Sequence, residues 1–419
     1  MRIRVEGQQA LNGVYRPSGN VNAALALLAA ALLTDRPVTL RRVPRTTTFN
    51  TLAALAESLG AHLAWAEDVL TVETHSITRR VLTSEDTAAS VGSILFLAPL
   101  LVQRRHARLE IDFPLNRIRT HLEALRDLRL DVLHSDGAVE FKAVEWDNRE
   151  VLLAQASVTA TALVMMLAAR LGERTVIHNA ACEPHLQSLA LLLTRMGARV
   201  EGIGSNVLTV YGQQALIGAE IIIRPDHIEA ASVAALAALT GGRLQIEGIH
   251  QPDLQMIDKI YKRLGIQLDI DSELVFVPRH DTLTVSNREE DVDSSIETAP
   301  WPGFPSDLVA IATVIATQAR GTSLIHEKMY SNRLLFVDKL KAMGAQIVLC
   351  DPHRAIVVGP TPLRHTYMDS PDVRTGFGLL AAAMIADGIT IIDNAQAVEH
   401  TFAGAIDKLR AVNARITYD

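Results

Sequence analysis

Hydrophobic and polar residues follow a pattern that repeats six times along the chain. Each copy contains a helix with one apolar face, which ends in Leu-Gly-Ala, Met-Gly-Ala or a variant and precedes two short strands around a polar turn. The copies are "LAALAESLGAHLAWAEDVLTV", "HLEALRDLRLDVLHSDGAVEF", "LALLLTRMGARVEGIGSNVLTV", "DKIYKRLGIQLDIDSELVFV", "VDKLKAMGAQIVLCDPHRAIVV" and "AIDKLRAVNARITYD". A sixfold copy of one unit predicts a repeat architecture.

The helix-ending residue of each copy recurs at a nearly constant interval. These residues lie 69, 68, 68, 79 and 69 positions apart, and they are Gly60, Arg129, Gly197, Gly265, Gly344 and Asn413. Glycine, or asparagine in its place, is typical of a helix C-terminus because the next residue adopts a left-handed conformation. The arginine departs from this rule, and we expect a different turn at that position.

A second helix, apolar on nearly every face, lies between these copies. Examples are "NAALALLAAALL" and "VTATALVMMLAARL". Such a helix is buried, and one repeat cannot cover it alone. We therefore expect an α/β architecture in which repeats associate in threes, with sheets outside and helices inside. The buried helices begin near Asn22, Val91, Val158, Glu229, Asp307 and Arg374.

The free N–H groups at these helix starts predict a site for anions. Helix N-termini carry partial positive charge and bind phosphates. Three of them facing one cleft favour a ligand such as a diphosphate.

Composition narrows the class of protein. Of 419 residues, 48% are hydrophobic but only 4% aromatic, so the core is aliphatic. A net charge of −7 argues against a nucleic-acid surface. The chain shows neither an 18-residue apolar run nor a signal peptide, and we expect a soluble, cytoplasmic protein. Cys182 and Cys350 form neither a metal motif nor a disulfide framework, and we expect no metal.

The stretch "TAPWPGFPSDLVAIATVIA", residues 298–316, places three prolines before Asp307 and an apolar helix. Two interpretations fit it. The aspartate caps the helix, or a stiffened loop holds its carboxylate where it accepts a proton from a substrate.

Six segments resemble the enolpyruvyl transferase superfamily, and most closely the branch that acts on UDP-N-acetylglucosamine in peptidoglycan precursor synthesis. They are "PSGNVNAAL", "NAACEPHLQSL", "RPDHIEAAS", "APWPGFPSDL", "SNRLLFVDKL" and "IDKLRA", and the resemblance extends over residues 1–419. It implies a two-domain inside-out α/β barrel, built from six βαβαββ-type repeats, with the active site in a cleft between domains. One domain would comprise residues 20–227 and the other residues 1–19 and 228–419. The substrates would be phosphoenolpyruvate and a UDP-sugar, with no cofactor.

The resemblance also implies roles for individual residues. Asp307 would remove the proton of the attacking sugar hydroxyl. Arg333 and Arg374 would bind carboxylate or phosphate, which suits the planar guanidinium. The resemblance also places Asn22, Glu183, Glu229 and the turn from Ser157 to Thr161, which includes Thr159, near the substrates. Arg117 and Arg119 would replace an arginine of the family's loop, and His400 would replace another family arginine. For each of these a structural role, as a helix start or a solvated surface group, is the alternative.

Several positions depart from the family pattern. Val21 stands where the family has a lysine and Val91 where it has an arginine; the segment 111–121 is shorter than the family's mobile loop and has no cysteine. Asp112 and His400 are the remaining candidates for the acid that protonates the enolpyruvyl methylene. Lost cations leave the charges of phosphoenolpyruvate less compensated.

Two classes of function therefore remain open. The chain is a divergent enolpyruvyl transferase, or a paralogue that kept the fold, lost the reaction and binds a sugar nucleotide or a partner. Altered chemistry on another phosphorylated substrate is a third possibility, since folds do not fix function.

Overall fold

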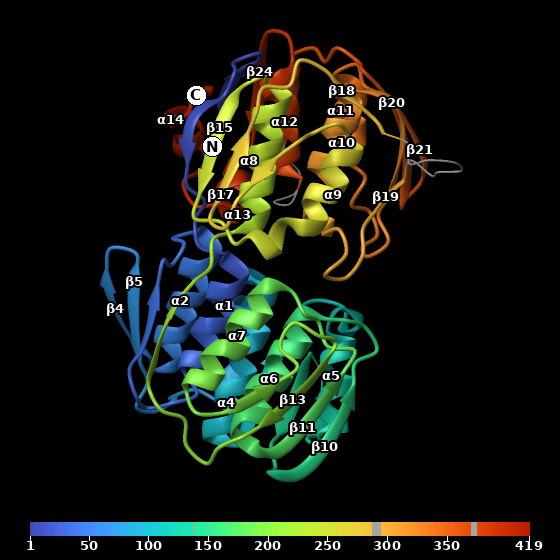
Figure 1. Ribbon diagram of the computed structural model, residues 1–419. Helices are drawn as coiled ribbons and strands as arrows, with labels where there is room; N and C mark the ends of the chain where they lie inside the picture. Colours follow the sequence, from blue (N-terminus) through green and yellow to red (C-terminus); the bar gives the residue numbers. More distant parts are fainter. Residues whose placement is uncertain (136, 287–294, 370–374) are drawn as a thin grey trace. The chain divides into compact units, whose positions relative to one another are not determined.

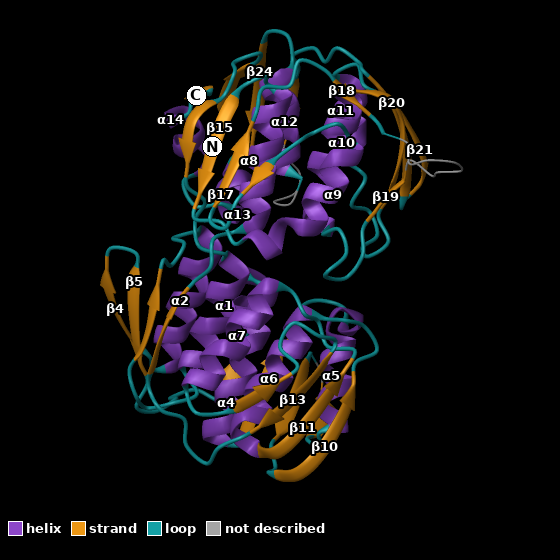
Figure 2. Ribbon diagram, viewed as in Figure 1, coloured by secondary structure: helices purple, strands orange, loops and turns teal. Residues whose placement is uncertain are grey.

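The computed structural model describes residues 1–135, 137–286, 295–369 and 375–419 (Figure 1). The chain divides into two compact units. Unit 1 comprises Met1–Ser18 and Pro225–Asp419, and unit 2 comprises Gly19–Arg224. In each unit the strands lie on the outside and the helices inside, as Figure 2 shows.

Unit 2 is built from three repeats, each with a nearly fully buried helical segment. Those segments are α1 (Val21–Ala31), the 3-10 helix η1 (Val91–Phe96) continued by α4 (Leu97–Arg104), and α6 (Val158–Leu171). The other helices are α2 (Thr47–Leu59), α3 (Ser84–Ala89), η2 (Leu115–Ile118), α5 (Arg119–Asp127) and α7 (Pro184–Arg195). The first sheet has the strand order β14 (Ala219–Ile222), β3 (Val38–Arg41), β5 (Val69–Glu73) and β4 (His62–Ala66). The second has the order β6 (Val81–Leu82), β7 (His106–Glu110), β9 (Ala138–Lys142) and β8 (Asp131–Ser135). The third has the order β10 (Trp146–Leu152), β11 (Gly172–His178), β13 (Val207–Tyr211) and β12 (Arg199–Glu201).

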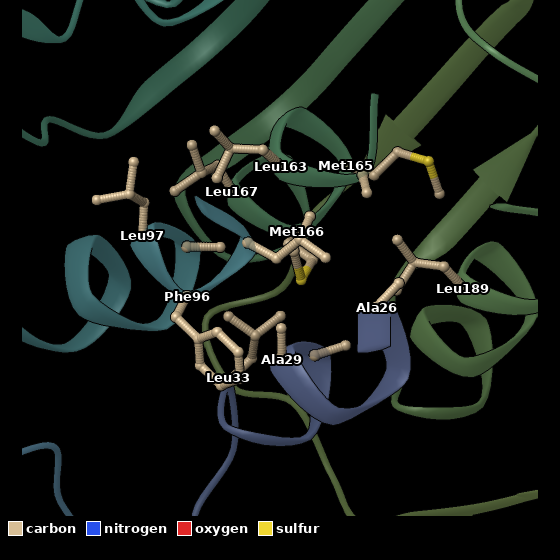
Figure 3. Close-up of a cluster of buried hydrophobic side chains, with 14 of the residues drawn as sticks. Ala26, Ala29, Leu33, Phe96, Leu97, Leu163, Met165, Met166, Leu167 and Leu189 are labelled. Carbon is tan, nitrogen blue, oxygen red and sulfur yellow. The ribbon is translucent and has the colours of Figure 1, made fainter. Parts of the chain in front are cut away.

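The core of unit 2 is aliphatic, as its composition predicts. Small residues of α1, among them Ala26 and Ala29, let neighbouring helices approach closely, and longer side chains such as Met166 fill the remaining space (Figure 3). Phe96 is the aromatic ring labelled in this cluster, and it is fully buried. Close packing without strain explains the Ala/Leu-rich sequence of the inner helices.

Unit 1 repeats the same plan. Its buried helices are α8 (His227–Leu239), α10 (Val309–Gln318), which follows the 3-10 turn η4 (Ser306–Leu308), and α12 (Gly376–Ile385). The other helices are η3 (Gln251–Leu254), α9 (Gln255–Arg263), α11 (Val337–Ala342), α13 (Gln396–Thr401) and α14 (Ala405–Ala411). One sheet has the strand order β16 (Asp269–Ile270), β17 (Leu274–Val277), β15 (Arg243–Glu247) and β2 (Asn12–Tyr15). Another has the order β18 (Leu283–Thr284), β20 (Ala319–His326), β22 (Arg354–Gly359) and β21 (Gln346–Asp351), and β19 (Ser295–Glu297) also pairs with β20. The third has the order β23 (Tyr367–Asp369), β24 (Ile389–Asp393), β1 (Ile3–Glu6) and β25 (Arg415–Tyr418).

All six sheets share one pairing pattern. In each sheet one edge strand pairs in parallel with the strand that follows the buried helix, and the other pairs of the four-strand order are antiparallel, as in β14–β3–β5–β4. The additional strand β19 also pairs in parallel with β20. The sixth copy of the repeat ends with β25, and β1 supplies the missing strand by pairing with both β24 and β25. Similarly, β2 lies parallel to β15. These pairings explain why the first 18 residues belong to unit 1.

The six helix-ending residues all adopt the left-handed conformation, including the arginine. The φ angle of Gly60 is 110°, that of Gly197 is 108° and that of Arg129 is 62°. The Leu130 amide donates to the Leu125 carbonyl at 3.0 Å, as the Ala61 amide does to Ala56. The expectation of a different turn at Arg129 was therefore wrong. The bond that closes the helix end dictates the positive φ, and the arginine adopts it at a cost of about 1 kcal/mol.

The predicted fold class is confirmed, including the repeated inner helices. Within the part of the chain that the structure covers, no helix combines the length and apolarity that a membrane crossing requires.

Candidate functional site

The proline-rich stretch leads from β19 into η4 and then α10. The cap position of η4 is Pro305 and that of α10 is Leu308, and neither makes a side-chain capping bond. Asp307 lies between them, inside the 3-10 turn, and occupies neither cap position. Asp307 is therefore not the capping residue of either helix.

Asp307 instead pairs with Arg333. Nη1 of the arginine donates to Oδ1 of the aspartate at 3.1 Å. The arginine side chain is 7% exposed and that of the aspartate 42% exposed, so the buried cation holds a carboxylate that solvent reaches. The guanidinium also lies 4.3 Å from the ring centroid of Tyr330. The structure thus brings two of the predicted site residues together.

The start of α8 lies close to this loop. The His227 ring packs edge-on against Trp301, with centroids 5.5 Å apart. Asp226 caps α8 by accepting hydrogen bonds from the amides of Ile228 and Glu229. Burial, followed by the negative charge of Glu229, raises the pKa of Asp226 to about 7, and Asp307 contributes to the same shift. The N-termini of α8 and α10 are therefore neighbours within unit 1.

Glu229 has a structural role. Its carboxylate is fully buried and accepts from the Tyr15 hydroxyl at 2.7 Å, the Ser18 amide at 2.9 Å and Lys408 Nζ at 2.6 Å. Burial, with the added charge of Glu229, raises the pKa of Tyr15 well above its usual range. The network fastens the first segment of unit 1 to α8 and α14.

In unit 2, the two asparagines at the start of α1 have different environments. Asn20 caps the helix by accepting from the Ala23 amide at 2.9 Å. Asn22 is exposed on the first turn, so capping does not account for it. Val21, in the place of the family lysine, is 8% exposed. At the next repeat, Gly92 at the start of η1 lies against the Leu25 side chain of α1, which places these two helix starts side by side.

The turn before α6 is held by hydrogen bonds. Ser157 caps the helix through the Ala160 amide, and the Thr159 hydroxyl lies 2.8 Å from Nε2 of His121. Burial lowers the pKa of His121 to about 4, so its ring is neutral at pH 7. Thr161 accepts from the Ala181 amide at 3.0 Å. The hydroxyls of this turn thus have structural partners before any ligand binds.

Glu183 occupies the cap position of α7, directly before Pro184. Burial and, secondarily, its charge raise the pKa of the neighbouring Cys182 thiol. Glu183 therefore lies at the start of a helix, beside a buried thiol.

The two arginines near the shortened loop differ in their surroundings. Arg117 lies in η2 and is exposed. Arg119 is the first residue of α5 and forms an ion pair with Glu123 at 2.7 Å. Asp112, the candidate acid, is exposed just after β7. Arg117 is therefore the better placed of the two to bind an anion.

The last two predicted site residues are His400 and Arg374. His400 is half-buried in the last turn of α13. Arg374 lies outside the described residues.

One buried carboxylate near Asp307 escaped the sequence analysis. Glu327 follows β20 and is fully buried. Ser323 and Ile325 of β20 are buried, so the two-residue period of the strand, continued by one step, is the signal that could have indicated a buried residue at 327.

Comparisons with known proteins agree with this architecture. Residues 5–409 match the family described as EPSP synthase (3-phosphoshikimate 1-carboxyvinyltransferase). The chain is 41% identical over 417 residues to the UDP-N-acetylglucosamine 1-carboxyvinyltransferase of Bradyrhizobium diazoefficiens, covering 98% of this chain and 96% of that protein. It is 38% identical to the protein of the same name from Treponema denticola, covering 98% of both.

Solved structures share the fold. The enolpyruvyl transferase NikO from Streptomyces tendae superposes with a TM-score of 0.88 at 20% identity, covering 99% of this chain and 98% of that one. EPSP synthase from Acinetobacter baumannii gives a TM-score of 0.77 at 16% identity, covering 99% of both chains. With the full-length sequence matches, these findings show that the chain belongs to the EPSP synthase family of enolpyruvyl transferases.

Proposed function

We propose that the protein transfers the enolpyruvyl group of phosphoenolpyruvate to a hydroxyl of UDP-N-acetylglucosamine and releases phosphate, in the cytoplasm. The observation that carries the proposal is the match to relatives of that name, 41% identical in one case, over nearly the whole of both chains. This match does not favour the alternative of a paralogue without turnover.

Asp307 is the proposed general base. The acceptor oxygen forms a bond to C2 of phosphoenolpyruvate while its proton passes to this carboxylate, and a proton adds to the C3 methylene. Loss of phosphate and of a C3 proton then restores the double bond. A base needs a fixed position within hydrogen-bond reach of the proton that it takes. The pairing of an exposed Asp307 with a buried Arg333 supports this role.

The other predicted residues are proposed to bind substrate. Exposure of Asn22 and Arg117 supports sugar and anion binding, respectively. Helix starts supply further positive potential where Val21 and Val91 replace cations. The remaining members of the proposed binding set are Arg119, Ser157, Thr159, Glu183, Arg333, Arg374 and His400, with Asp112 or His400 as the methylene acid.

An acceptor comparison tests the proposal. The purified chain is incubated with phosphoenolpyruvate and either UDP-N-acetylglucosamine or 3-phosphoshikimate, and phosphate release is followed. The proposal predicts that phosphate is released when the acceptor is UDP-N-acetylglucosamine and not when it is 3-phosphoshikimate. Phosphate release only with 3-phosphoshikimate would contradict the proposal that UDP-N-acetylglucosamine is the acceptor. A thermal shift with the nucleotide sugar but no release would instead indicate binding without turnover.

A further inference from the structure

The Glu327 carboxylate accepts four hydrogen bonds from two separate segments. Its Oε1 accepts from the Thr298 hydroxyl at 3.0 Å and from the amides of Met329 and Tyr330 at 2.8 and 3.0 Å. Its Oε2 accepts from the Ser306 hydroxyl at 2.5 Å. Thr298 in turn accepts from the Lys328 amide at 2.9 Å. One buried side chain therefore joins both ends of the proline-rich stretch to the segment after β20.

These contacts form a closed ring that includes the Asp307–Arg333 pair. Ser306 directly precedes Asp307, and the Tyr330 ring lies beneath the guanidinium of Arg333. The ring runs from Asp307 through Ser306, Glu327 and Tyr330 to Arg333, and the ion pair closes it. The segments that carry the two charged groups are thus fixed to one common carboxylate.

A ring of this kind is more than packing. An apolar side chain of the same volume would leave two hydroxyls and two amides without an acceptor in a buried place, which is costly. The carboxylate satisfies all four donors, and in doing so it fixes the distance between the segments. A displacement of about 1 Å at a reacting group lowers a rate roughly 100-fold.

We propose that Glu327 is a positioning residue, which holds Asp307 at the distance and orientation that proton removal from the acceptor requires. The inference rests on the proposed function, because it assigns Asp307 as the base. Glu327 is buried beneath the loop and acts through Ser306 and Tyr330.

The principal variant is Glu327→Gln, which keeps the size but replaces one acceptor oxygen with an amide donor. Glu297→Gln is the matched control, because Glu297 lies on the neighbouring strand β19 and pairs at the surface with Lys328. Thr298→Val removes one donor to Glu327, and with it the acceptor of the Lys328 amide, without changing the volume, and Thr298→Ser restores the hydroxyl. This second pair keeps the test decisive if Glu327→Gln does not fold.

Two measurements are made on each variant. Amide hydrogen exchange is followed in peptides that contain residues 298–308 and 327–333, and kcat is measured beside the Kd for UDP-N-acetylglucosamine. We expect Glu327→Gln and Thr298→Val to speed exchange in both peptides roughly tenfold or more. We also expect kcat to fall roughly 10- to 100-fold with little change in Kd. Glu297→Gln and Thr298→Ser should match the unmodified protein.

A folded Glu327→Gln variant with unchanged kcat would overturn the inference, as would unchanged exchange in both peptides. A loss of kcat that Thr298→Val shares and Thr298→Ser does not rescue would also overturn it, because the hydroxyl would then be irrelevant. If the unmodified chain does not turn over the two substrates, the proposed function fails. The exchange rates need no substrate and still decide whether Glu327 holds the segments together.

Discussion

Arg333 donates a hydrogen bond to Asp307 across 26 positions of sequence, with Nη1 and Oδ1 3.1 Å apart. The arginine is buried and the aspartate half-exposed, so the pair has one fixed and one accessible member. A fixed donor of this kind orients the carboxylate before substrate binds. Charge-assisted hydrogen bonds are the strong ones in proteins, and guanidinium geometry adds direction.

Substitution of Arg333 with lysine should lower activity without unfolding the protein. Lysine keeps the charge but loses the planar fork and the stacking on Tyr330. We expect kcat to fall about 10- to 100-fold, which corresponds to a charged hydrogen bond of about 1.5–3 kcal/mol. Arg415→Lys is the control, because Arg415 forms an exposed pair with Glu6 at 2.8 Å. Equal kcat values for both variants would argue against an orienting role of Arg333.

The ion pair between the fully buried Glu229 and the partly exposed Lys408 allows a prediction about stability. Lys408→Met leaves the Glu229 carboxylate buried without its cation, and we expect the free energy of unfolding to drop by about 3 kcal/mol. Lys262→Met removes the exposed partner of Asp258, and it should cost no more than about 0.5 kcal/mol. Denaturant unfolding of both variants measures the difference. Similar losses would show that burial of the pair is unimportant.

Asp226 gives the stability a pH dependence. Its pKa is raised from 3.8 to about 7, so the folded protein binds this proton more tightly than the unfolded chain. The stabilisation from the bound proton is therefore complete below about pH 4 and lost as pH rises to about 7. The slope is at most about 1.4 kcal/mol per pH unit.

Asp226→Asn removes this dependence while keeping the helix cap, since asparagine is also a good cap. We expect the variant to be more stable than the unmodified protein at pH 8, and we expect the advantage to vanish near pH 4. Thermal unfolding at both pH values measures it. A constant difference across this range would contradict the assignment of the shift to Asp226.

The left-handed Arg129 predicts a stabilising substitution. Arg129→Gly relieves the positive φ, and we expect a gain of about 1 kcal/mol in the free energy of unfolding. Gly197→Ala is the reverse control: a side-chain carbon there meets nothing within 4 Å, so its expected loss of about 1 kcal/mol comes from φ alone. If the two changes do not have opposite signs, strain at these helix ends is not the cause.

The sequence predicted the fold well because the pattern of buried positions repeats. Helices α1, α6 and α8 begin within two residues of the expected Asn22, Val158 and Glu229. The completion of the sixth sheet by β1 was not predictable, because β1 and its partner β25 lie at opposite ends of the sequence. The turn at Arg129 was mispredicted because the repeat's geometry overrides the preference of a single residue.

For the candidate site, the sequence indicated residues but not the contacts between them. The proline-rich stretch identified Asp307, and a motif identified Arg333, but nothing local indicated that they pair. Only the backbone angles of the folded chain showed that Asn20, and not Asn22, caps α1. Glu327 could have been found from the two-residue period of β20, whereas its four donors come from segments that only the fold brings together.

The most direct test of the central claim compares phosphate release by the unmodified protein and by Asp307→Asn, with saturating phosphoenolpyruvate and UDP-N-acetylglucosamine. Asparagine keeps the shape and can still accept from Arg333, but it cannot take a proton. We expect the unmodified chain to release phosphate and the variant to be about 10²- to 10⁴-fold slower, the usual contribution of a positioned base. Release by Asp307→Asn at the unmodified rate, or none from the unmodified chain, would contradict the assignment.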